Sequence, residues 1–400
     1  MLTLLALPPA VLLVCGFTLA LGLSFLFTGV IGRLARRLGW LDQPSERRVH
    51  QVPVPRLGGV AIFLAFLITA LLVYWPGGAH EAYVYGGFLP AGIFITAVMA
   101  YDDVRGLPPG TKLALQSAAV LILLIPGLLS GSTIEHGMVI SYIHNPLHLT
   151  SSKSADILMI PLGLALPFTW FWIVGMMNTV NFTDGLDGLA GGIVGIAAVV
   201  LTIISFLLHQ GTVGILCAIF AGSVLGFLPH NWNPAKIFMG DSGAMFLGLA
   251  LAVLSNIGGA KLATILLLLG IPILDVALVI LQRIRGGRAA FHYDKRHLHH
   301  KLLESGFSQK QIVLIFYSLS CFFGLLAILA LTLPDAFPLV FSLSIAGASL
   351  AHVIGLALVG LAMLLILSFL IRRPKQPKQP EMLKQPTSPG GGSRNPSIGD

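Results

Sequence analysis

The chain has 400 residues, of which 56% are hydrophobic and only 10% are charged. Because a soluble domain carries about 25% charged residues, this composition and the mean hydropathy of +0.88 exclude an ordinary water-soluble protein and predict that lipid surrounds most of the chain. The formal net charge of +8 needs no nucleic-acid partner, since the basic residues follow the pattern of a membrane topology.

Apolar segments near the length of a membrane-spanning helix, roughly 20 residues, recur along the chain. We expect eleven, at residues 8–30, 57–75, 84–101, 112–130, 158–177, 189–208, 211–228, 243–257, 262–281, 311–332 and 345–371. The predicted fold class is therefore all-α: residues 1–373 form a polytopic integral membrane domain with about 11 transmembrane helices. Residues 374–400, rich in Pro, Gly, Ser and Gln, are expected to form a disordered cytoplasmic tail.

The basic residues predict the orientation of these spans, because cytoplasmic loops carry an excess of Lys and Arg. No Lys or Arg precedes the first apolar segment, which favours a retained helix over a secretory signal. With the N-terminus outside, alternation puts all of the 24 basic residues on the inner side except Lys153 and Lys261. The C-terminus is then cytoplasmic.

The same alternation gathers the polar segments of the chain on the cytoplasmic side, because each follows an odd-numbered span. They lie around Asp102, at residues 178–192, at 230–243 and at 283–304. Carboxylates that repel one another on one face need a cation to hold them together. Oxygen ligands combined with substrate phosphates suit Mg²⁺.

Two acidic motifs have both a structural and a functional interpretation. Asp102 and Asp103 could simply cap a helix; because adjacent helical residues point in different directions, we expect one to face the site and the other to support it. Asn181, Asp184 and Asp187 recur at three-residue spacing between glycines, which would put them on one face of a helical turn. Helix caps would use the same residues, but the repetition favours a functional site.

Asp241 lies between glycines at a predicted helix start. It is either an N-cap or part of an anion-binding site, and both interpretations suit phosphate chemistry. His50 and Arg56 precede the Gly58–Gly59 helix start in a Pro-x-Pro-Arg-x-Gly-Gly arrangement. The positive-inside rule accounts for the arginine and does not require this arrangement.

Three histidines, His297, His299 and His300, lie in a segment that also carries Arg283 and Arg288. One alternative is a solvated helix at the membrane interface, and another is a zinc site, although no cysteine cluster completes it. Together, the imidazoles and guanidinium groups favour a clamp for phosphate or pyrophosphate.

These segments together resemble the polyprenyl-phosphate N-acetylhexosamine-1-phosphate transferase family, which includes WecA-like and TarO-like enzymes and is related to phospho-MurNAc-pentapeptide transferase. The resemblance runs from about Arg33 to Glu304, through five motifs in the family's order. The His-Leu-His-His-Lys-Leu form of the histidine segment and the eleventh span favour the N-acetylhexosamine branch over the pentapeptide branch.

The resemblance implies roles for individual residues. The residues that match catalytic positions are Asp102, Asp103, Asp184, His297, His299 and His300. The residues that match substrate-binding positions are His50, Arg56, Lys112, Asn181, Asp187, Asn231, Arg283 and Arg288. Within this set, Lys112 is expected to meet phosphate, while Asp187 and Asn231 are expected to contact the nucleotide. Asp241 matches the main Mg²⁺ ligand, with Asn181 assisting, and Mn²⁺ is expected to substitute. Gln116 matches a polar position that follows Lys112.

The activity that the resemblance implies is transfer of N-acetylhexosamine-1-phosphate, with GlcNAc preferred, from a UDP-sugar to undecaprenyl phosphate, with release of UMP. This would be the first membrane step of a cell-envelope glycan, such as lipopolysaccharide or teichoic acid, at the cytoplasmic face of a bacterial inner membrane. Related enzymes suggest a homodimer. Two alternatives stay open: the pentapeptide-transferring sibling, and a secondary transporter, which would place ionisable groups near the bilayer midplane. Asp275 is the clear acid inside a predicted span.

Overall fold

The computed structural model describes residues 8–43, 52–130, 138–144, 157–257, 262–270, 272–276, 279 and 298–332. These residues are mostly helical. The helices are α1 (Pro9–Leu38), α2 (Gly58–Val73), α3 (Ala79–Arg105), α4 (Pro109–Leu129), α5 (Leu162–Thr183), α6 (Leu189–Leu207), α7 (Gly211–Asn231), α8 (Gly240–Asn256), α9 (Leu262–Leu268), α11 (Leu298–Glu304) and α12 (Gln309–Thr332).

Within these described ranges, seven helices are long and apolar enough to cross a membrane: α1, α3, α4, α5, α6, α7 and α12. Helix α2 is apolar but shorter, with 16 residues. Each of these helices coincides with a predicted span, so the structure agrees with a polytopic membrane protein. The predicted eleventh span and the predicted tail at 374–400 lie outside the described residues.

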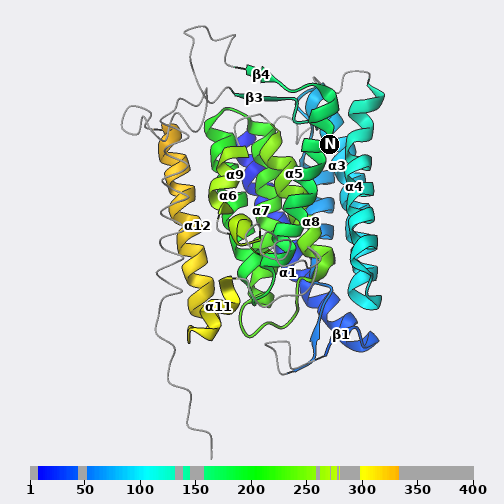
Figure 1. Cartoon of the computed structure of the whole chain (residues 1–400), viewed down its shortest axis with the longest axis vertical. Helices are drawn as coiled ribbons and strands as arrows, with labels where there is room; N and C mark the ends of the chain where they lie inside the picture. Colours follow the sequence, from blue (N-terminus) through cyan, green and yellow to red (C-terminus); the bar gives the residue numbers. More distant parts are fainter. Residues whose placement is uncertain are drawn as a thin grey trace, which may run out of the picture.

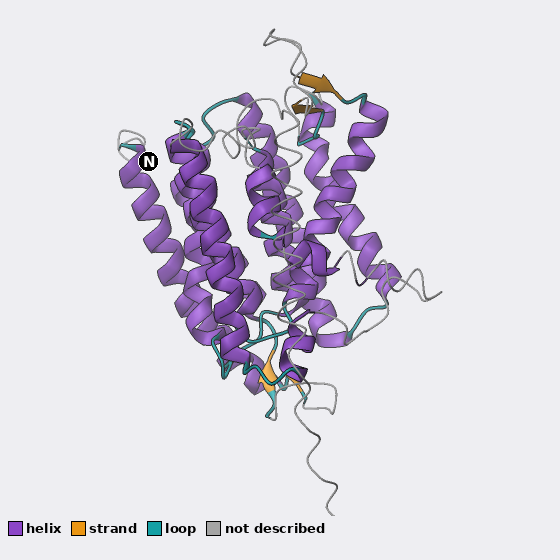
Figure 2. Ribbon diagram, turned by 60° about the vertical axis from the view of Figure 1, so that its left-hand side comes forward, coloured by secondary structure: helices purple, strands orange, loops and turns teal. Residues whose placement is uncertain are grey.

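The long helices run roughly side by side, and the chain passes up and down between the two ends of the bundle (Figure 1). Helix α3 ends and α8 begins at the lower end in this view, which we call the site end; helix α1 begins at the opposite end, which we call the far end. Figure 2 shows loops and short strands gathered at these two ends, with helices between them.

Two small antiparallel sheets depart from the all-α prediction. Strand β1 (Leu41–Asp42) pairs with β2 (Val54–Pro55) at the site end, and β3 (Tyr142–His144) pairs with β4 (Ile157–Met159) at the far end. Both pairs form between connecting segments, where backbone N–H and C=O groups are outside any helix and pair with each other. Helix α5 consequently begins at Leu162, later than the predicted start of its span at residue 158.

Helix α8 lies in the centre of the bundle, and every residue from Gly240 to Ser255 is buried. Small residues allow its neighbours to approach closely. A Cβ atom on Gly248 would lie 2.4 Å from Cα of Met177 on α5, so only glycine fits this crossing. The core position of α8 matters for the site, because its first turn carries Asp241.

The first turns of α2 and α8 cross in direct contact. A Cβ atom on Gly59 would lie 1.9 Å from the backbone nitrogen of Gly243, and the N–H groups of Gly58 and Gly59 donate to the carbonyls of Phe238 and Met239 at 2.9 and 2.8 Å. This crossing explains why a Gly-Gly pair follows Arg56: it brings that arginine to the start of α8.

Candidate active site

Three carboxylates from two distant parts of the chain meet at the site end. Asp102 and Asp103 lie in the last turns of α3, and Asp241 lies in the first turn of α8. One oxygen from each lies within 4.8 Å of the others. Asp102 and Asp241 are only 5% and 8% exposed. Buried carboxylates this close repel one another, so the arrangement requires nearby positive charge.

Lys112 supplies part of this charge. Its Nζ atom lies 2.6 Å from Oδ2 of Asp102 and 2.6 Å from Oδ2 of Asp241. A tight turn makes this possible: Gly106 adopts a φ of 73° at the end of α3, and Oδ1 of Asp102 accepts the N–H of Leu107 at 2.6 Å. Helix α4 therefore starts beside the end of α3, and its first turn returns Lys112 to Asp102.

Asp103 holds the N-terminus of α8. Its Oδ1 accepts the N–H of Asp241 at 2.7 Å, while its Oδ2 accepts the N–H of Ser242 at 3.1 Å and the Ser242 hydroxyl at 2.7 Å. These N–H groups have no partner within α8. The two adjacent aspartates therefore have different partners, Lys112 for Asp102 and the start of α8 for Asp103. Both oxygens of Asp103 bind α8 and orient Asp241, and a catalytic role for Asp103 stays a prediction.

Arg56 lies at the rim of the cluster. Its guanidinium nitrogens are 3.5 Å from Oδ1 of Asp241, 3.7 Å from Oδ1 of Asp103 and 3.8 Å from Oδ1 of Asp42, and its side chain is 35% exposed. These distances are longer than those of Lys112. The guanidinium is therefore a loosely held cation that faces both the carboxylates and the outside of the site.

Asn181 and Asp184 bring the end of α5 to the same cluster. The side-chain amide of Asn181 donates to Oδ1 of Asp241 at 3.2 Å. Asp184 caps the end of α5. Burial raises the pKa of its carboxyl to about 7; the Arg56 guanidinium opposes this shift, and the carboxylates of Asp241 and Asp103 add to it. The charges of Arg56, Asp241 and Asp103 therefore act on the carboxyl of Asp184.

Asp187 and Asn231 are engaged with the main chain. Oδ2 of Asp187 accepts the N–H of Ala235 at 3.0 Å. Asn231, which is 2% exposed, accepts the N–H of Gly188 and donates to the carbonyl of Ile237, both at 3.0 Å. These bonds fasten the connection between α7 and α8 to the start of α6. Nucleotide contact stays a prediction for both residues.

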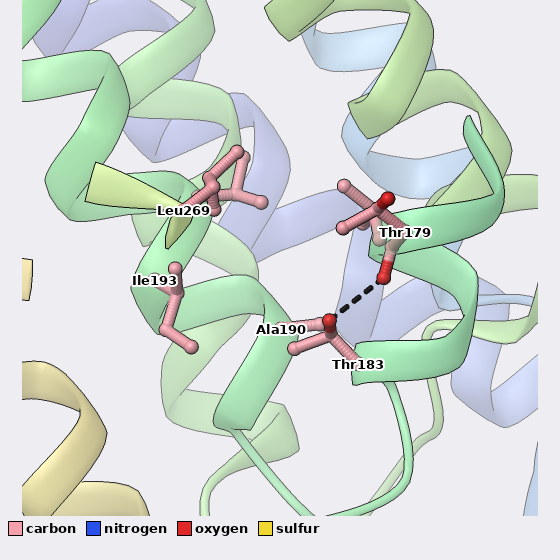
Figure 3. Close-up of a pocket in the computed structure, with 7 residues that line it drawn as sticks. Thr179, Thr183, Ala190, Ile193 and Leu269 are labelled. Carbon is pink, nitrogen blue, oxygen red and sulfur yellow. Dashed lines mark hydrogen bonds between the residues drawn. The ribbon is translucent and has the colours of Figure 1, made fainter. Parts of the chain in front are cut away.

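An apolar hollow lies against the stretch of α5 that carries Asn181. It is too narrow to hold a water molecule and is lined by residues of α5 and α6 and by Leu269; Thr179, Thr183, Ala190, Ile193 and Leu269 are labelled in Figure 3. The Thr183 hydroxyl donates to the Thr179 carbonyl at 2.7 Å. The polar atom of this threonine is therefore satisfied, and the hollow is a narrow apolar gap in the packing of α5 against α6.

Comparison with known proteins identifies the family. Residues 85–259 match the family described as glycosyl transferase family 4. The chain is 37% identical to a decaprenyl-phosphate N-acetylglucosaminephosphotransferase of Mycobacterium leprae, over 76% of this chain and 79% of the relative. The chain belongs to the polyprenyl-phosphate N-acetylhexosamine-1-phosphate transferase family.

Two other relatives fall on the two branches considered above. A probable undecaprenyl-phosphate N-acetylglucosaminyl 1-phosphate transferase of Bacillus subtilis is 30% identical over 79% of this chain and 84% of the relative. A phospho-N-acetylmuramoyl-pentapeptide-transferase of Staphylococcus aureus is 29% identical over 78% of this chain and 96% of the relative. These relatives are transferases by name, which favours an enzyme over a transporter.

The oxygen atoms of this polyprenyl-phosphate transferase site fit a divalent cation. One oxygen each of Asp102, Asp103 and Asp241 meets the others at this point, and the amide nitrogen of Asn181 donates to Oδ1 of Asp241. Carboxylate and amide oxygens suit Mg²⁺. The Lys112 ammonium already lies between Asp102 and Asp241, so the geometry of this site attracts a positive charge there.

Several residues that the family resemblance singles out cannot be placed. His50, Arg283, Arg288 and His297 lie outside the described residues, and His299 and His300 lie on α11 with undescribed side chains. A hydrogen bond attaches the helix that carries two of these histidines: Oδ1 of Asp275 accepts the N–H of Leu298, the first residue of α11, at 2.8 Å. Asp275 thus ties the predicted ninth span to the start of the histidine-bearing helix.

Proposed function

We propose that the protein transfers N-acetylglucosamine-1-phosphate from UDP-GlcNAc to undecaprenyl phosphate and releases UMP. The observation that carries this proposal is the cluster of Asp102, Lys112, Asn181 and Asp241 at one end of an apolar helix bundle. The relatives named as N-acetylglucosamine phosphotransferases of prenyl phosphates are more similar to this chain than the named pentapeptide transferase.

The reaction is attack by an oxygen of the prenyl phosphate on the β-phosphorus of the UDP-sugar, with the bond to the UMP oxygen breaking. Phosphoryl transfer depends mainly on charge neutralisation and in-line positioning. Lys112 is suited to bind phosphate oxygens, because its ammonium lies between Asp102 and Asp241 at the centre of the cluster. Arg56, at the exposed rim, is suited to a phosphate group that enters from outside.

Asp102 orients or deprotonates the lipid phosphate. We favour direct attack over an aspartyl-phosphate intermediate, because the acceptor is already anionic and the Asp102 oxygens are engaged by Leu107 and Lys112. Asp103 positions Asp241 through the first turn of α8. Asp241 and Asn181 would hold Mg²⁺ or Mn²⁺, which supplies charge neutralisation at the pyrophosphate when it is bound.

The remaining family positions complete the proposal. Asp187 and Asn231 contact the nucleotide, and Asp184 takes part in catalysis beside Asp241. The residues that hold the remaining phosphate charge are His50, Arg283, Arg288, His297, His299 and His300. These roles follow from the match of each residue to the family motifs.

The membrane setting follows from the substrates. A prenyl chain stays in lipid and a UDP-sugar in water, so the reaction belongs at the surface where they meet. We propose eleven spans with the N-terminus outside, the site end facing the cytoplasm of a bacterial inner membrane, and a cytoplasmic tail over residues 374–400. The preference for basic residues on the inner side supports this orientation. We also propose a homodimer, by analogy with the family.

The test is UMP release by the purified full chain. The protein is offered UDP-GlcNAc, UDP-GalNAc or UDP-MurNAc-pentapeptide, each with and without undecaprenyl phosphate and with Mg²⁺ or EDTA. We expect release with UDP-GlcNAc only when both undecaprenyl phosphate and Mg²⁺ are present. Release with UDP-MurNAc-pentapeptide instead would assign the protein to the pentapeptide-transferring branch. Detection of a covalent sugar-phosphate on Asp102 would contradict direct attack.

A further inference from the structure

A second polar layer lies one helical turn behind the charged cluster. Its members follow or precede cluster residues by three or four positions: Gln116 after Lys112 on α4, Asn178 before Asn181 on α5, and Met245 after Asp241 on α8. Residues at this spacing share a helix face, and one turn rises about 5.4 Å. Because α4 and α8 start and α5 ends at the site end, all three side chains lie deeper in the bundle than the cluster.

The layer is joined by a reciprocal pair of amides. Nε2 of Gln116 donates to Oδ1 of Asn178 at 3.3 Å and approaches Sδ of Met245 at 3.0 Å. Nδ2 of Asn178 donates to Oε1 of Gln116 at 3.0 Å and to the carbonyl of Val174 at 2.8 Å. Gln116 is 1% exposed. Buried amides that lose their partners are costly, so this pair specifies one relative position of α4 and α5.

The position of α4 along α5 and α8 needs a specific contact to define it, because α4 packs mainly against α3 and meets α5 over a smaller contact. Its Lys112 must nevertheless reach Asp241 on α8. Gln116 links α4 to α5 through Asn178 and to α8 through Met245. The layer therefore joins the three helices that carry Lys112, Asn181 and Asp241.

We infer that the Gln116–Asn178 pair positions the transfer site: it holds α4, α5 and α8 in the register that brings Lys112, Asn181 and Asp241 together. Neither amide is a catalytic residue, because each is bonded within the bundle. The consequence for turnover rests on the proposed function, while the assembly of the cluster can be measured independently of it.

The chain offers a matched control on the same two helices. Nε1 of Trp170 on α5 donates to the Ser117 hydroxyl on α4 at 2.9 Å, on the exposed side of the bundle. This bond also joins α4 to α5, but Ser117 is five residues from Lys112 and outside the layer. Ser117→Ala removes an α4–α5 hydrogen bond without touching the amide pair.

The test compares the single variants Gln116→Met and Asn178→Leu with the double variant and with Ser117→Ala. Each single variant leaves a buried amide without its partner and should lower Tm. The double variant should regain most of Tm, because apolar replacement of both partners is nearly neutral. We expect its kcat to stay at least about tenfold below that of the wild type, with KM for UDP-GlcNAc nearly unchanged. Ser117→Ala should keep the wild-type kcat.

Recovery of kcat together with Tm in the double variant would overturn the inference, since the pair would then act on stability alone. If the double variant does not fold, the exchange Gln116→Asn/Asn178→Gln keeps both amides and their summed length. That exchange should have a higher kcat than either of its single substitutions; a kcat no higher would overturn the inference.

Mn²⁺ binding separates this inference from the proposed function. The apolar double variant should bind Mn²⁺ at least about tenfold more weakly than the wild type, because the oxygens of the cluster no longer meet. If the double variant does not fold, we expect the same weakening in Gln116→Asn and in Asn178→Gln. Wild-type Mn²⁺ affinity in these variants would count against the pair. An absence of UMP release from the wild type would count against the proposed function only.

Discussion

The two ends of the helix bundle use carboxylates differently. At the far end, Glu81 on α3 stands apart from the charged cluster and is bound by neutral donors: the Tyr74 hydroxyl at 3.1 Å, the Gly77 N–H at 2.9 Å and the Thr212 hydroxyl at 2.7 Å. These bonds tie α3 to the end of α2 and the start of α7. This carboxylate therefore has a structural role: it joins three helices through hydrogen bonds.

At the site end, three carboxylates lie within 4.8 Å of one another and two cationic side chains, Lys112 and Arg56, approach them. Such crowding costs stability unless the charges are matched. To hold helices together, one carboxylate with neutral hydrogen-bond donors is enough, as at the far end. The difference indicates that the charge at the site end serves a ligand. Variants at the site end should therefore lose mainly activity, and variants at the far end should lose mainly stability.

The largest effect on activity is expected for Asp241→Ala. UMP release should fall by about a thousandfold or more, because loss of several kcal/mol of charge stabilisation changes the rate by that factor. Tm should fall by no more than a few degrees, because Lys112 and Arg56 each lose one partner but keep Asp102 and Asp103, respectively. Substantial activity in this variant would remove Asp241 from the mechanism.

A smaller effect is expected for Lys112→Met, which keeps the length of the side chain and removes its charge. UMP release should fall by about a hundredfold. Without a divalent cation, the carboxylates of Asp102 and Asp241 lose their shared partner, so Tm should fall in EDTA and recover more on addition of Mg²⁺ than it does in the wild type. An equal response of both proteins to Mg²⁺ in thermal unfolding would contradict this account of the lysine.

The smallest effect on activity is expected for Glu81→Gln at the far end. The substitution replaces an acceptor by a donor that faces hydroxyl groups, which should cost about 1–2 kcal/mol of unfolding free energy. Tm should fall by a few degrees, and UMP release should stay within about twofold of the wild type. A loss of activity larger than that of Lys112→Met would mean that the two ends do not differ as described.

The sequence predicted the helices and the convergence of Asp102 and Asp241 because both depend on simple patterns. Apolar length locates the spans, and their alternation puts every odd-numbered connection at one end. The same patterns predicted that Asp102 and Asp103 would differ in role, since adjacent helical residues diverge.

The sequence did not predict which polar groups bind each other. The amides of Gln116 and Asn178 are 62 residues apart, and Asn231 binds the main chain of Gly188 across 43 residues. A local pattern marks such residues as polar but does not identify their partners. The β3–β4 pair was missed for a related reason: its strands are short, and their pairing depends on the connection between two helices.

The central claim is that Asp241 and its neighbours form one divalent-cation site at the site end. Mn²⁺ titration of the purified chain, followed by loss of the free-ion electron paramagnetic resonance signal, tests it most directly. We predict a saturable site in the wild type and in Glu81→Gln, and its loss in Asp241→Ala. Equal Mn²⁺ binding by Asp241→Ala and the wild type would contradict the claim.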